Sequence, residues 1–422
     1  MPPATDLASL AGGGTVFASG AREKLARLRA ELEPLARRYD VVVANPPYMG
    51  SGSLAKWSSE WVKKQYPDEK SDLCTSFIER GFTLSRADGF NAMVTMQSWM
   101  FLGSYEKMRG KILRKHEISS MAHLGTRAFG AIGGEVVSTT ATVFGNTASA
   151  TLGTYFRLVD MGSETEKLEG LLEALADPEC GWLYHADTSA FAAIPGSPIA
   201  YWASKTMVDA FLHGTCLNKK AYGCNGLTTG DNALFLRHWS EVSVSRIDFH
   251  LGSNVDLEII DAWVPYNKGG EFQKWAAHLD NVINWKNGGS EIKSYGHLVM
   301  RSKDYMLRAG FSWSKISSGR IAMRRIPEGF MFDVAGLSLF PNTPESGLLY
   351  EAFVNSGVAS AFLSFLSPTL NFEVGNVTSM PLLDLSSNGR QICELAQSCS
   401  ELVEEYRDYG ETSWSFKRHP LV

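Results

Sequence analysis

Residues 39–50 read YDVVVANPPYMG, and this stretch decides the fold class. Residues 41–44 form a short, wholly apolar run, which is typical of a strand buried on both faces in a parallel sheet covered by helices. The tetrapeptide Asn45-Pro46-Pro47-Tyr48 follows this run directly. Because active sites of open α/β sheets form beyond the carboxyl ends of the strands, the tetrapeptide stands where a catalytic loop is expected.

The sequence around this strand alternates between helical and strand patterns. An amphipathic helix that Pro34 bends or ends is predicted over residues 21–38, with its apolar stripe at Leu25, Leu28, Leu32 and Leu35. Further helices are expected over residues 72–86 and 104–116, and strands over residues 90–96, 118–124, 136–144 and 151–159. The basic residues of the helix over 104–116 are interpreted as an ordinary exposed face; they are Lys107, Arg109, Lys111, Arg114 and Lys115. This alternation predicts a doubly wound α/β domain.

Changes in composition along the chain predict five parts. They are a flexible N-terminal segment rich in Gly, Ala and Ser (residues 1–20), the α/β domain (21–160), an acidic bridging helical segment (161–205), a strand-rich α+β domain with scattered tryptophans (206–390), and a C-terminal helix and tail (391–422). A chain of 422 residues is long enough for each larger part to bury a core of its own.

The overall composition excludes several classes of protein. With 44% hydrophobic and 20% charged residues the chain is expected to fold, and a net charge of −5 argues against a polybasic protein without excluding a nucleic-acid enzyme. Six cysteines without zinc-ligand spacing predict reduced thiols and no metal site. The N-terminus has no signal-peptide pattern, and no apolar run approaches the roughly 18 residues of a membrane span. A cytoplasmic protein without a membrane contact is therefore expected.

The tetrapeptide has the residue types needed to activate an exocyclic amine of a nucleobase. Such an amine is a poor nucleophile, because its lone pair is delocalised into the ring. The Asn45 side-chain oxygen and the Pro46 carbonyl can accept its two N–H groups and free the lone pair. Pro46 and Pro47 restrict the backbone, and Tyr48 offers a flat face for a base flipped out of the duplex. The alternative is a proline-rich turn with Tyr48 as a packing residue.

Beyond this chemistry, the stretch YDVVVANPPYMG resembles motif IV of DNA adenine-N6 methyltransferases. The similarity continues along the chain in the phrases SDLCTSFIERGFTLSRADGFNAMVTMQSWMFL, GEVVSTTATVF, GLTTGDNALFLRHWSEV, WVPYNKGGEFQKW, GFSWSKISSGR and LSPTLNFEVGNV. Together these phrases resemble the PglX-type methyltransferases of BREX phage-defence systems, with type IIG restriction-modification enzymes as more distant relatives. The resemblance covers most of residues 20–385.

The resemblance implies both a fold and a function. The fold is an α/β chain with a partial S-adenosylmethionine-dependent methyltransferase (Rossmann-like) sheet, followed by an α+β target-recognition domain. Asn45, Pro46, Pro47 and Tyr48 would bind the target amine and its base, with S-adenosyl-L-methionine as methyl donor and double-stranded DNA as substrate. Methylation would mark host DNA as self, and the protein would act with other phage-defence proteins.

The chain departs from this family in its N-terminal part. The glycine motif that cradles the donor is missing, since Ala11-Gly12-Gly13-Gly14 neither follows a predicted strand nor has an acidic partner about 20 residues later. We therefore expect the C-terminal part of the enzyme: a fragment, a truncated gene product or one half of a split protein. In a methyltransferase sheet, residues 41–44 are expected to lie beside the strand over residues 90–96, and the strand on their other side is missing here. Residues 41–44 would then lie at an open sheet edge and pair with a missing N-terminal portion, dimerise or aggregate.

A basic stretch at residues 301–325 predicts DNA contacts in the second domain. Seven Arg and Lys residues face one acidic residue, Asp304, which gives a net charge of +6. The candidate DNA-binding residues are Arg301, Lys303, Trp313, Ser314, Lys315, Arg320, Arg324 and Arg325, with Lys268 as a weaker candidate. The alternative is an ordinary solvated basic surface.

Three readings of the function stay open at this level. The first is a site-specific DNA adenine methyltransferase, and the second is a non-catalytic DNA-recognition or assembly module or part of a type IIG enzyme. A methyltransferase acting on RNA or protein would share the tetrapeptide, although the phrases of the second domain argue against it. Binding of S-adenosylmethionine separates the first reading from the second.

Overall fold

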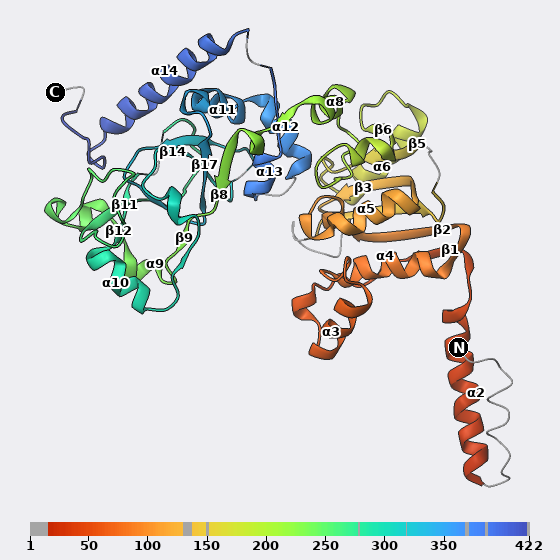
Figure 1. Cartoon of the computed structure of the whole chain (residues 1–422). Coiled ribbons are helices and arrows are strands. Elements are labelled where there is room, and N and C mark those ends of the chain that lie inside the picture. The colour runs from red at the N-terminus through yellow and green to blue at the C-terminus, as the bar shows by residue number, and fades with distance from the viewer. Residues whose placement is uncertain are drawn as a thin grey trace. The chain divides into compact units, whose positions relative to one another are not determined.

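The computed structural model describes residues 16–129, 137–148, 152–276, 279–317, 319–367, 371–384 and 387–419 (Figure 1). The chain divides into two compact units, Met1–Ala192 and Ala193–Val422. Residues 1–15 of the predicted flexible segment, including the glycine run, lie outside the described residues. Helix α2 (Val16–Ala36) begins five residues before the predicted start, so residues 16–20 are helical. Pro34 lies in the last turn of α2.

The first unit is built on a six-stranded sheet in the order β1-β2-β4-β3-β5-β6. The strands are β1 (Tyr39–Ala44), β2 (Ser85–Met96), β3 (Glu117–Gly125), β4 (Thr139–Gly145), β5 (Leu152–Arg157) and β6 (Leu183–Asp187). The predicted neighbour of β1 is confirmed, because β1 pairs with β2 in parallel and Val41 lies opposite Phe90. The sheet is mixed, since β4 lies antiparallel between β2 and β3. The alternation of strand and helix patterns favours parallel strands, and β4 departs from that expectation.

Helices cover one face of this sheet. Besides α2, the helices of the first unit are α3 (Lys56–Gln65), α4 (Leu73–Leu84), α5 (Glu106–Lys115), α6 (Glu164–Ala176) and α7 (Thr188–Ala192). Phe82 of α4 packs edge-on against Phe144 of β4 at 5.4 Å, and Tyr155 of β5 packs against Phe191 of α7 at 6.0 Å. The apolar faces of α4 and α5 are thereby buried against the sheet.

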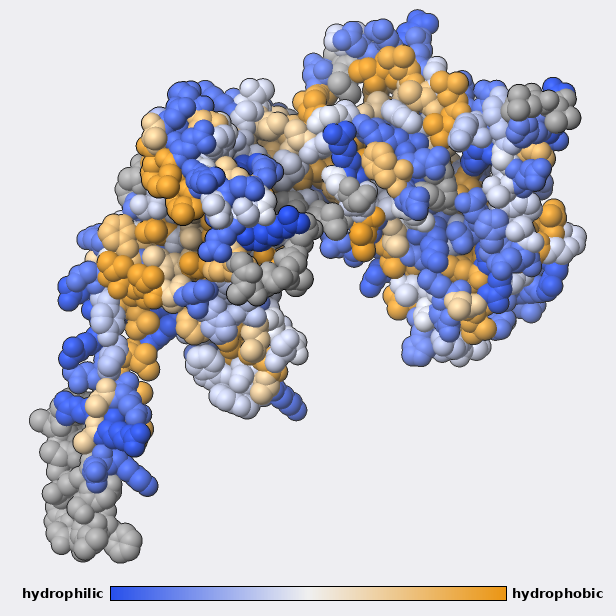
Figure 2. Space-filling view, turned by 180° about the vertical axis from the view of Figure 1, so that it is seen from behind, coloured by the Kyte–Doolittle hydropathy of each residue, from blue (hydrophilic) through white to orange (hydrophobic). Residues whose placement is uncertain are grey.

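The opposite face of the sheet is only partly covered. A hollow of about 290 Å³ is lined by mostly apolar residues of strands β1 to β5 and by Leu171 of α6. Val41 and Val43 of β1 are 55% and 74% exposed, so the interpretation of residues 41–44 as a strand buried on both faces is wrong. The physical reason is that strand side chains point to two faces, and α4 packs against only one face of β1 while Val43 lines the hollow on the other. In Figure 2 apolar side chains gather on the first unit where α2 meets the sheet.

The second unit combines short strands with helices, as predicted for an α+β domain. Its strands are β7 (Thr215–Cys216), β8 (Ala221–Cys224), β9 (Leu227–Thr228), β10 (Leu236–His238), β11 (Trp263–Asn267), β12 (Asn281–Asn284), β13 (Val299–Met300), β14 (Gly310–Ser314), β15 (Met323–Ile326), β16 (Met331–Phe332), β17 (Gly336–Pro341) and β18 (Pro381–Leu382). Its helices are α8 (Lys205–His213), α9 (Asn232–Phe235), α10 (Lys286–Ser294), α11 (Gly347–Val354), α12 (Gly357–Leu366), α13 (Val374–Thr378) and α14 (Gly389–Asp408). A short 3-10 helix, η7, spans Lys303–Tyr305.

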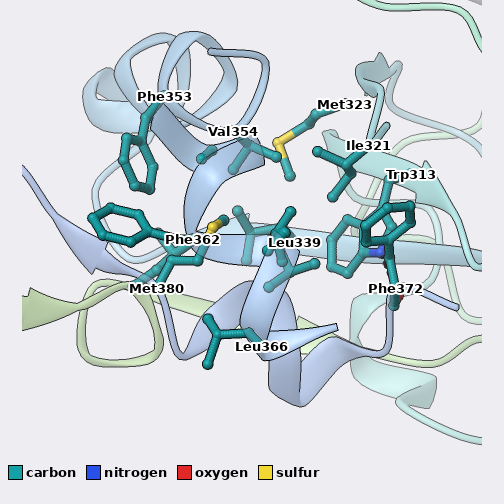
Figure 3. Close-up of a cluster of buried hydrophobic side chains, with 14 of the residues drawn as sticks. Trp313, Ile321, Met323, Leu339, Phe353, Val354, Phe362, Leu366, Phe372 and Met380 are labelled. Atoms are coloured by element: carbon teal, nitrogen blue, oxygen red, sulfur yellow. Dashed lines mark hydrogen bonds between the residues drawn. The ribbon is translucent and has the colours of Figure 1, made fainter. Parts of the chain in front are cut away.

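Two four-stranded sheets organise this unit, in the orders β15-β14-β17-β8 and β10-β12-β11-β16. The largest apolar cluster lies between the first sheet and helices α11 and α12 (Figure 3). There Trp313 and Leu339 from the sheet and Phe362 from α12 are almost completely buried. The predicted tryptophan-rich α+β domain therefore has a core of its own.

Among the described residues no single helix is long and apolar enough to cross a membrane. The helical segments Pro344–Val354 and Gly357–Leu366 are long and apolar enough only when they are taken together, and the chain bends by 73° between them.

Candidate functional site

The candidate site is the loop that follows β1. Asn45 is exposed, Pro46 is buried and Tyr48 is partly buried. The Tyr48 hydroxyl lies 3.0 Å from Asn45 Oδ1 and 3.4 Å from the Val94 carbonyl of β2. A hydroxyl has one proton to donate, so the shorter bond to Asn45 is the stronger candidate. Burial raises the pKa of Tyr48 to about 12, which keeps the phenol protonated and able to donate at neutral pH.

A buried carboxylate holds this loop in place. Asp72 is 8% exposed, and its Oδ1 accepts hydrogen bonds from the Met49 amide at 3.2 Å and from the Cys74 amide at 2.9 Å. The second bond caps the first turn of α4, and the Leu73 amide also donates to the Met49 carbonyl at 2.9 Å. The loop after β1 is thus tied to the N-terminus of α4. Sequence reasoning missed Asp72, although an Asp directly before an apolar helical pattern is an N-cap signal.

The loop after β2 is held by buried basic groups. Arg109 of α5 is fully buried, and its Nη1 donates to the carbonyls of Trp99 and Leu102 at 2.8 and 2.7 Å. His123 Nε2 lies 2.7 Å from Gln97 Oε1. Our interpretation of the basic residues of α5 as an ordinary exposed face is therefore wrong for Arg109. It is wrong for Lys111 as well, since this side chain pairs with Glu69 and Glu79.

The geometry of the first loop suits an amine that offers two N–H groups. Asn45 Oδ1 has two lone pairs, and the bond from Tyr48 uses one of them. No donor from the described residues contacts the Pro46 carbonyl. The Asn45 side chain is exposed, so its second lone pair can be reached by a ligand. The loop therefore has one exposed acceptor, Asn45 Oδ1, and a second carbonyl without a donor from the described residues, that of the buried Pro46, beside a partly exposed aromatic ring.

The predicted DNA-binding residues separate into exposed and buried groups. Arg301 and Arg320 are exposed, Lys303 pairs with Glu258 at 3.2 Å, and Lys315 pairs with Glu373 at 2.8 Å. Ser314 and Lys268 are partly buried. The structure brings their segments together, since Ser314 Oγ donates to the Gly270 carbonyl at 2.7 Å.

Trp313 and Arg324 do not lie on the surface, which corrects their assignment as DNA contacts. They are 0% and 1% exposed, and the Trp313 Nε1 group donates to the Phe372 carbonyl at 2.8 Å. Burial lowers the pKa of Arg324 to about 10. Arg325 is partly buried and pairs with the fully buried Glu351 at 3.2 Å. Side chains of a strand alternate between its two faces, so a count of charges along the sequence overstates the basic surface.

Comparison with known proteins finds that the chain is similar to a restriction-modification methylase family and to adenine-specific methyltransferases. Residues 21–129 match the Eco57I restriction-modification methylase family. Over 92% of its length the chain is similar to the adenine-specific methyltransferase PglX of Lacticaseibacillus casei (strain Zhang), at 42% identity, and to BrxX of Escherichia coli O9:H4 (strain HS), at 39% identity. The chain spans about a third of these relatives, 33% and 31% of their length. The predicted resemblance to PglX-type methyltransferases is confirmed.

Solved structures agree on the fold. The type IIL restriction-modification enzyme MmeI in complex with DNA superposes with a TM-score of 0.55 at 11% identity, covering 89% of this chain and 50% of that chain. A nuclease-deletion mutant of the type ISP enzyme LlaGI, in complex with a DNA substrate mimic, superposes with a TM-score of 0.53 at 12% identity, covering 89% of this chain and 42% of that chain. The predicted fold class is confirmed: an α/β chain with a partial methyltransferase sheet, followed by an α+β unit.

Proposed function

We propose that this relative of the PglX-type adenine-specific methyltransferases supplies the target-amine site of a DNA adenine-N6 methyltransferase in a phage-defence system. The observation that carries the proposal is the loop of Asn45, Pro46, Pro47 and Tyr48 at the carboxyl end of β1, with the Tyr48 hydroxyl 3.0 Å from Asn45 Oδ1. Its two acceptors match the two N–H groups of an adenine amine.

The residues of the loop would act on a base flipped out of the duplex. Asn45 Oδ1 and the Pro46 carbonyl each accept one N–H group, which draws the nitrogen towards a tetrahedral shape and frees its lone pair. The Tyr48 ring stacks on the base, and its hydroxyl keeps the Asn45 side chain oriented. Pro46 and Pro47 hold the backbone in the binding conformation before the base arrives.

The methyl donor would be S-adenosylmethionine, which supplies an electrophilic methyl group. The described residues do not form a cradle for it: neither loop at this end of β1 and β2, residues 45–50 and 97–102, is rich in glycine. We therefore assign no step to the donor in this chain. In our proposal the donor is held by another part of a longer protein or by a partner chain.

The second unit is proposed to contact double-stranded DNA. Its candidate contacts are the surface and partly buried polar residues of the predicted set, namely Lys268, Arg301, Lys303, Ser314, Lys315 and Arg320. Cationic side chains of this kind neutralise phosphates and set the salt dependence of binding. Other phage-defence proteins are proposed as further partners through the PglX resemblance.

Asn45→Ala tests the proposed function directly. Transfer of a radiolabelled methyl group to unmethylated DNA is measured with the chain alone and with the chain co-expressed with the remainder of the L. casei relative. Loss of one preorganised acceptor is expected to lower the rate by about 10²–10³, with DNA affinity unchanged. Asn388→Ala, at an exposed asparagine of the second unit, is the matched control.

A wild-type rate for Asn45→Ala would exclude the assigned role of the loop. The absence of a donor cradle from the described residues favours one second candidate, a DNA-recognition module without catalysis. DNA binding without methyl transfer in both arms of the assay would support that candidate.

A further inference from the structure

The second unit contains a cavity of about 790 Å³ whose function the proposal above does not explain. It lies beside edge strand β8 and is lined by aromatic, arginine and amide side chains, among them Tyr222, Tyr305, Arg308, Phe340, Asn342 and Gln397. This volume falls within the range of about 300–1,000 Å³ that is usual for small-molecule sites.

An aromatic stack forms one wall of the cavity. The rings of Tyr222 and Tyr305 lie nearly parallel, with centroids 4.4 Å apart and an interplanar angle of 17°. The Phe340 ring is tilted against Tyr305 at 4.9 Å. Tyr222 stands at the outer end and is 45% exposed. A partly exposed ring at the end of a stack is a platform on which another flat ring can lie.

The polar groups of the cavity complement a ligand that carries both an anion and hydrogen-bonding edges. Arg308 is exposed, lies 5.1 Å from the Tyr305 ring and has no acidic partner among the described residues. The other arginine, Arg325, is already bound to Glu351 and to Gln397. The side-chain amide of Asn342 can both donate and accept hydrogen bonds, and the carboxylate of Glu404 can accept them.

We propose that this cavity binds a single nucleotide, with the base stacked on Tyr222 and the phosphate held by Arg308. Asn342 and Glu404 would accept hydrogen bonds from the exocyclic amine of the base, as carboxylates and amides do in base recognition. An uncharged lipid would leave the arginine and the carboxylate without partners, and an acidic peptide would leave the aromatic stack unused. Both a free nucleotide and an unstacked nucleotide of a DNA strand have the required chemistry.

Two probes distinguish these sources. Free dAMP is titrated into the full chain by calorimetry, and a short single-stranded DNA carrying one 2-aminopurine is titrated while the quenching of its fluorescence by stacking is followed. Tyr222→Ala should weaken binding of the relevant probe at least about fivefold, since loss of base–aromatic stacking alone is worth that much. Arg308→Ala should weaken it about tenfold or more, since it removes a charged hydrogen bond to the phosphate. Tyr222→Phe keeps the ring and should bind as the wild type does.

Two surface variants serve as controls. Tyr406→Ala and Arg390→Ala change residues of the same types that are exposed on α14 and do not line the cavity, and they should have no effect. If Tyr222→Ala and Arg308→Ala weaken dAMP binding, the ligand is a free nucleotide. If they weaken only the quenching of the DNA probe, the ligand is an unstacked nucleotide of a DNA strand. If neither probe binds, or if both alanine variants bind as the wild type does, the proposal is wrong. Asn45 is itself proposed to accept the amine of adenine, so the dAMP titrations are repeated with Asn45→Ala as the background. The weakening caused by Tyr222→Ala and Arg308→Ala should persist in that background, which separates this test from that of the proposed function.

Discussion

The Tyr48 hydroxyl donates to Asn45 Oδ1 at 3.0 Å, so two residues of one loop are already joined before any base is present. Proteins commonly fix a functional side chain by a second contact of this kind, which reduces the reorganisation needed when the ligand binds. The relationship makes Tyr48 both a stacking surface and a positioning residue for Asn45. These two roles can be separated by substitution.

Tyr48→Phe removes only the hydroxyl and should lower kcat by about two- to tenfold, the effect of one net hydrogen bond. Tyr48→Ala also removes the ring and should raise KM for DNA, because a stacked base is worth about 1–3 kcal/mol. Both kcat and KM are measured by methylation kinetics of the chain co-expressed with the remainder of the L. casei relative. Equal kinetics for Tyr48→Phe and Tyr48→Ala would contradict the division of roles.

Replacing exposed arginines of the second unit should change the salt dependence of DNA binding. For Arg301→Ala combined with Arg320→Ala, the slope of log K against log salt should fall by about 0.9 for each phosphate that the variant no longer neutralises. Fluorescence anisotropy with duplex DNA over a salt series measures the slope. An unchanged slope would leave this region an ordinary basic surface, and Arg390→Ala is the surface control.

Arg324→Met should not change the salt dependence of DNA binding, unlike the exposed arginines. The Arg324 guanidinium is buried, and two of its nitrogens, Nε and Nη1, have no hydrogen-bond partner. Replacing such a buried charge by an apolar side chain of similar length is often neutral or stabilising. We expect a free energy of unfolding equal to or above that of the wild type and an unchanged salt slope. A reduced slope would place Arg324 in contact with DNA after all.

The exposed valines of β1 should promote self-association. Edge strands with free N–H and C=O groups pair with other chains, and a charged side chain on such an edge blocks pairing. Light scattering over a concentration series should show association of the wild type and a shift to monomer for Val43→Lys. Val244→Lys, at an exposed valine of the second unit, should have no effect. A wild type that stays monomeric and binds S-adenosylmethionine would contradict the expected open edge.

Glu351 should make the second unit less stable as the pH rises. Burial raises its pKa to about 7 from 4.5, and Arg325 only partly opposes this rise. Between pH 4.5 and 7 the unfolded chain releases this proton while the folded chain keeps it, so the free energy of unfolding falls by up to about 3 kcal/mol. In denaturant unfolding, the free energy of unfolding should differ less between pH 5 and pH 7 for Glu351→Gln than for the wild type. Glu345→Gln is an exposed control, and an equal difference in all three proteins would contradict the shift.

Local patterns in the sequence were sufficient to predict the part of the fold that surrounds the candidate loop. The apolar run before Asn45 and the two prolines after it are neighbours along the chain, so their pattern predicts a strand followed by a rigid loop without any knowledge of tertiary contacts. The partner of that strand was predicted correctly as residues 90–96. The pairing of Tyr48 with Asn45 spans three residues, yet it depends on rotamers that no pattern reveals.

What the sequence by itself determined is therefore the order of strands and helices along the chain and the position of the acceptor loop, because both depend on short-range periodicity and backbone restriction. Only the tertiary structure decided which faces are covered: it left Val43 exposed, buried Trp313 and Arg324, and inserted β4 between β2 and β3. Periodicity shows that two faces of a strand differ, but burial depends on which distant segment packs against each face.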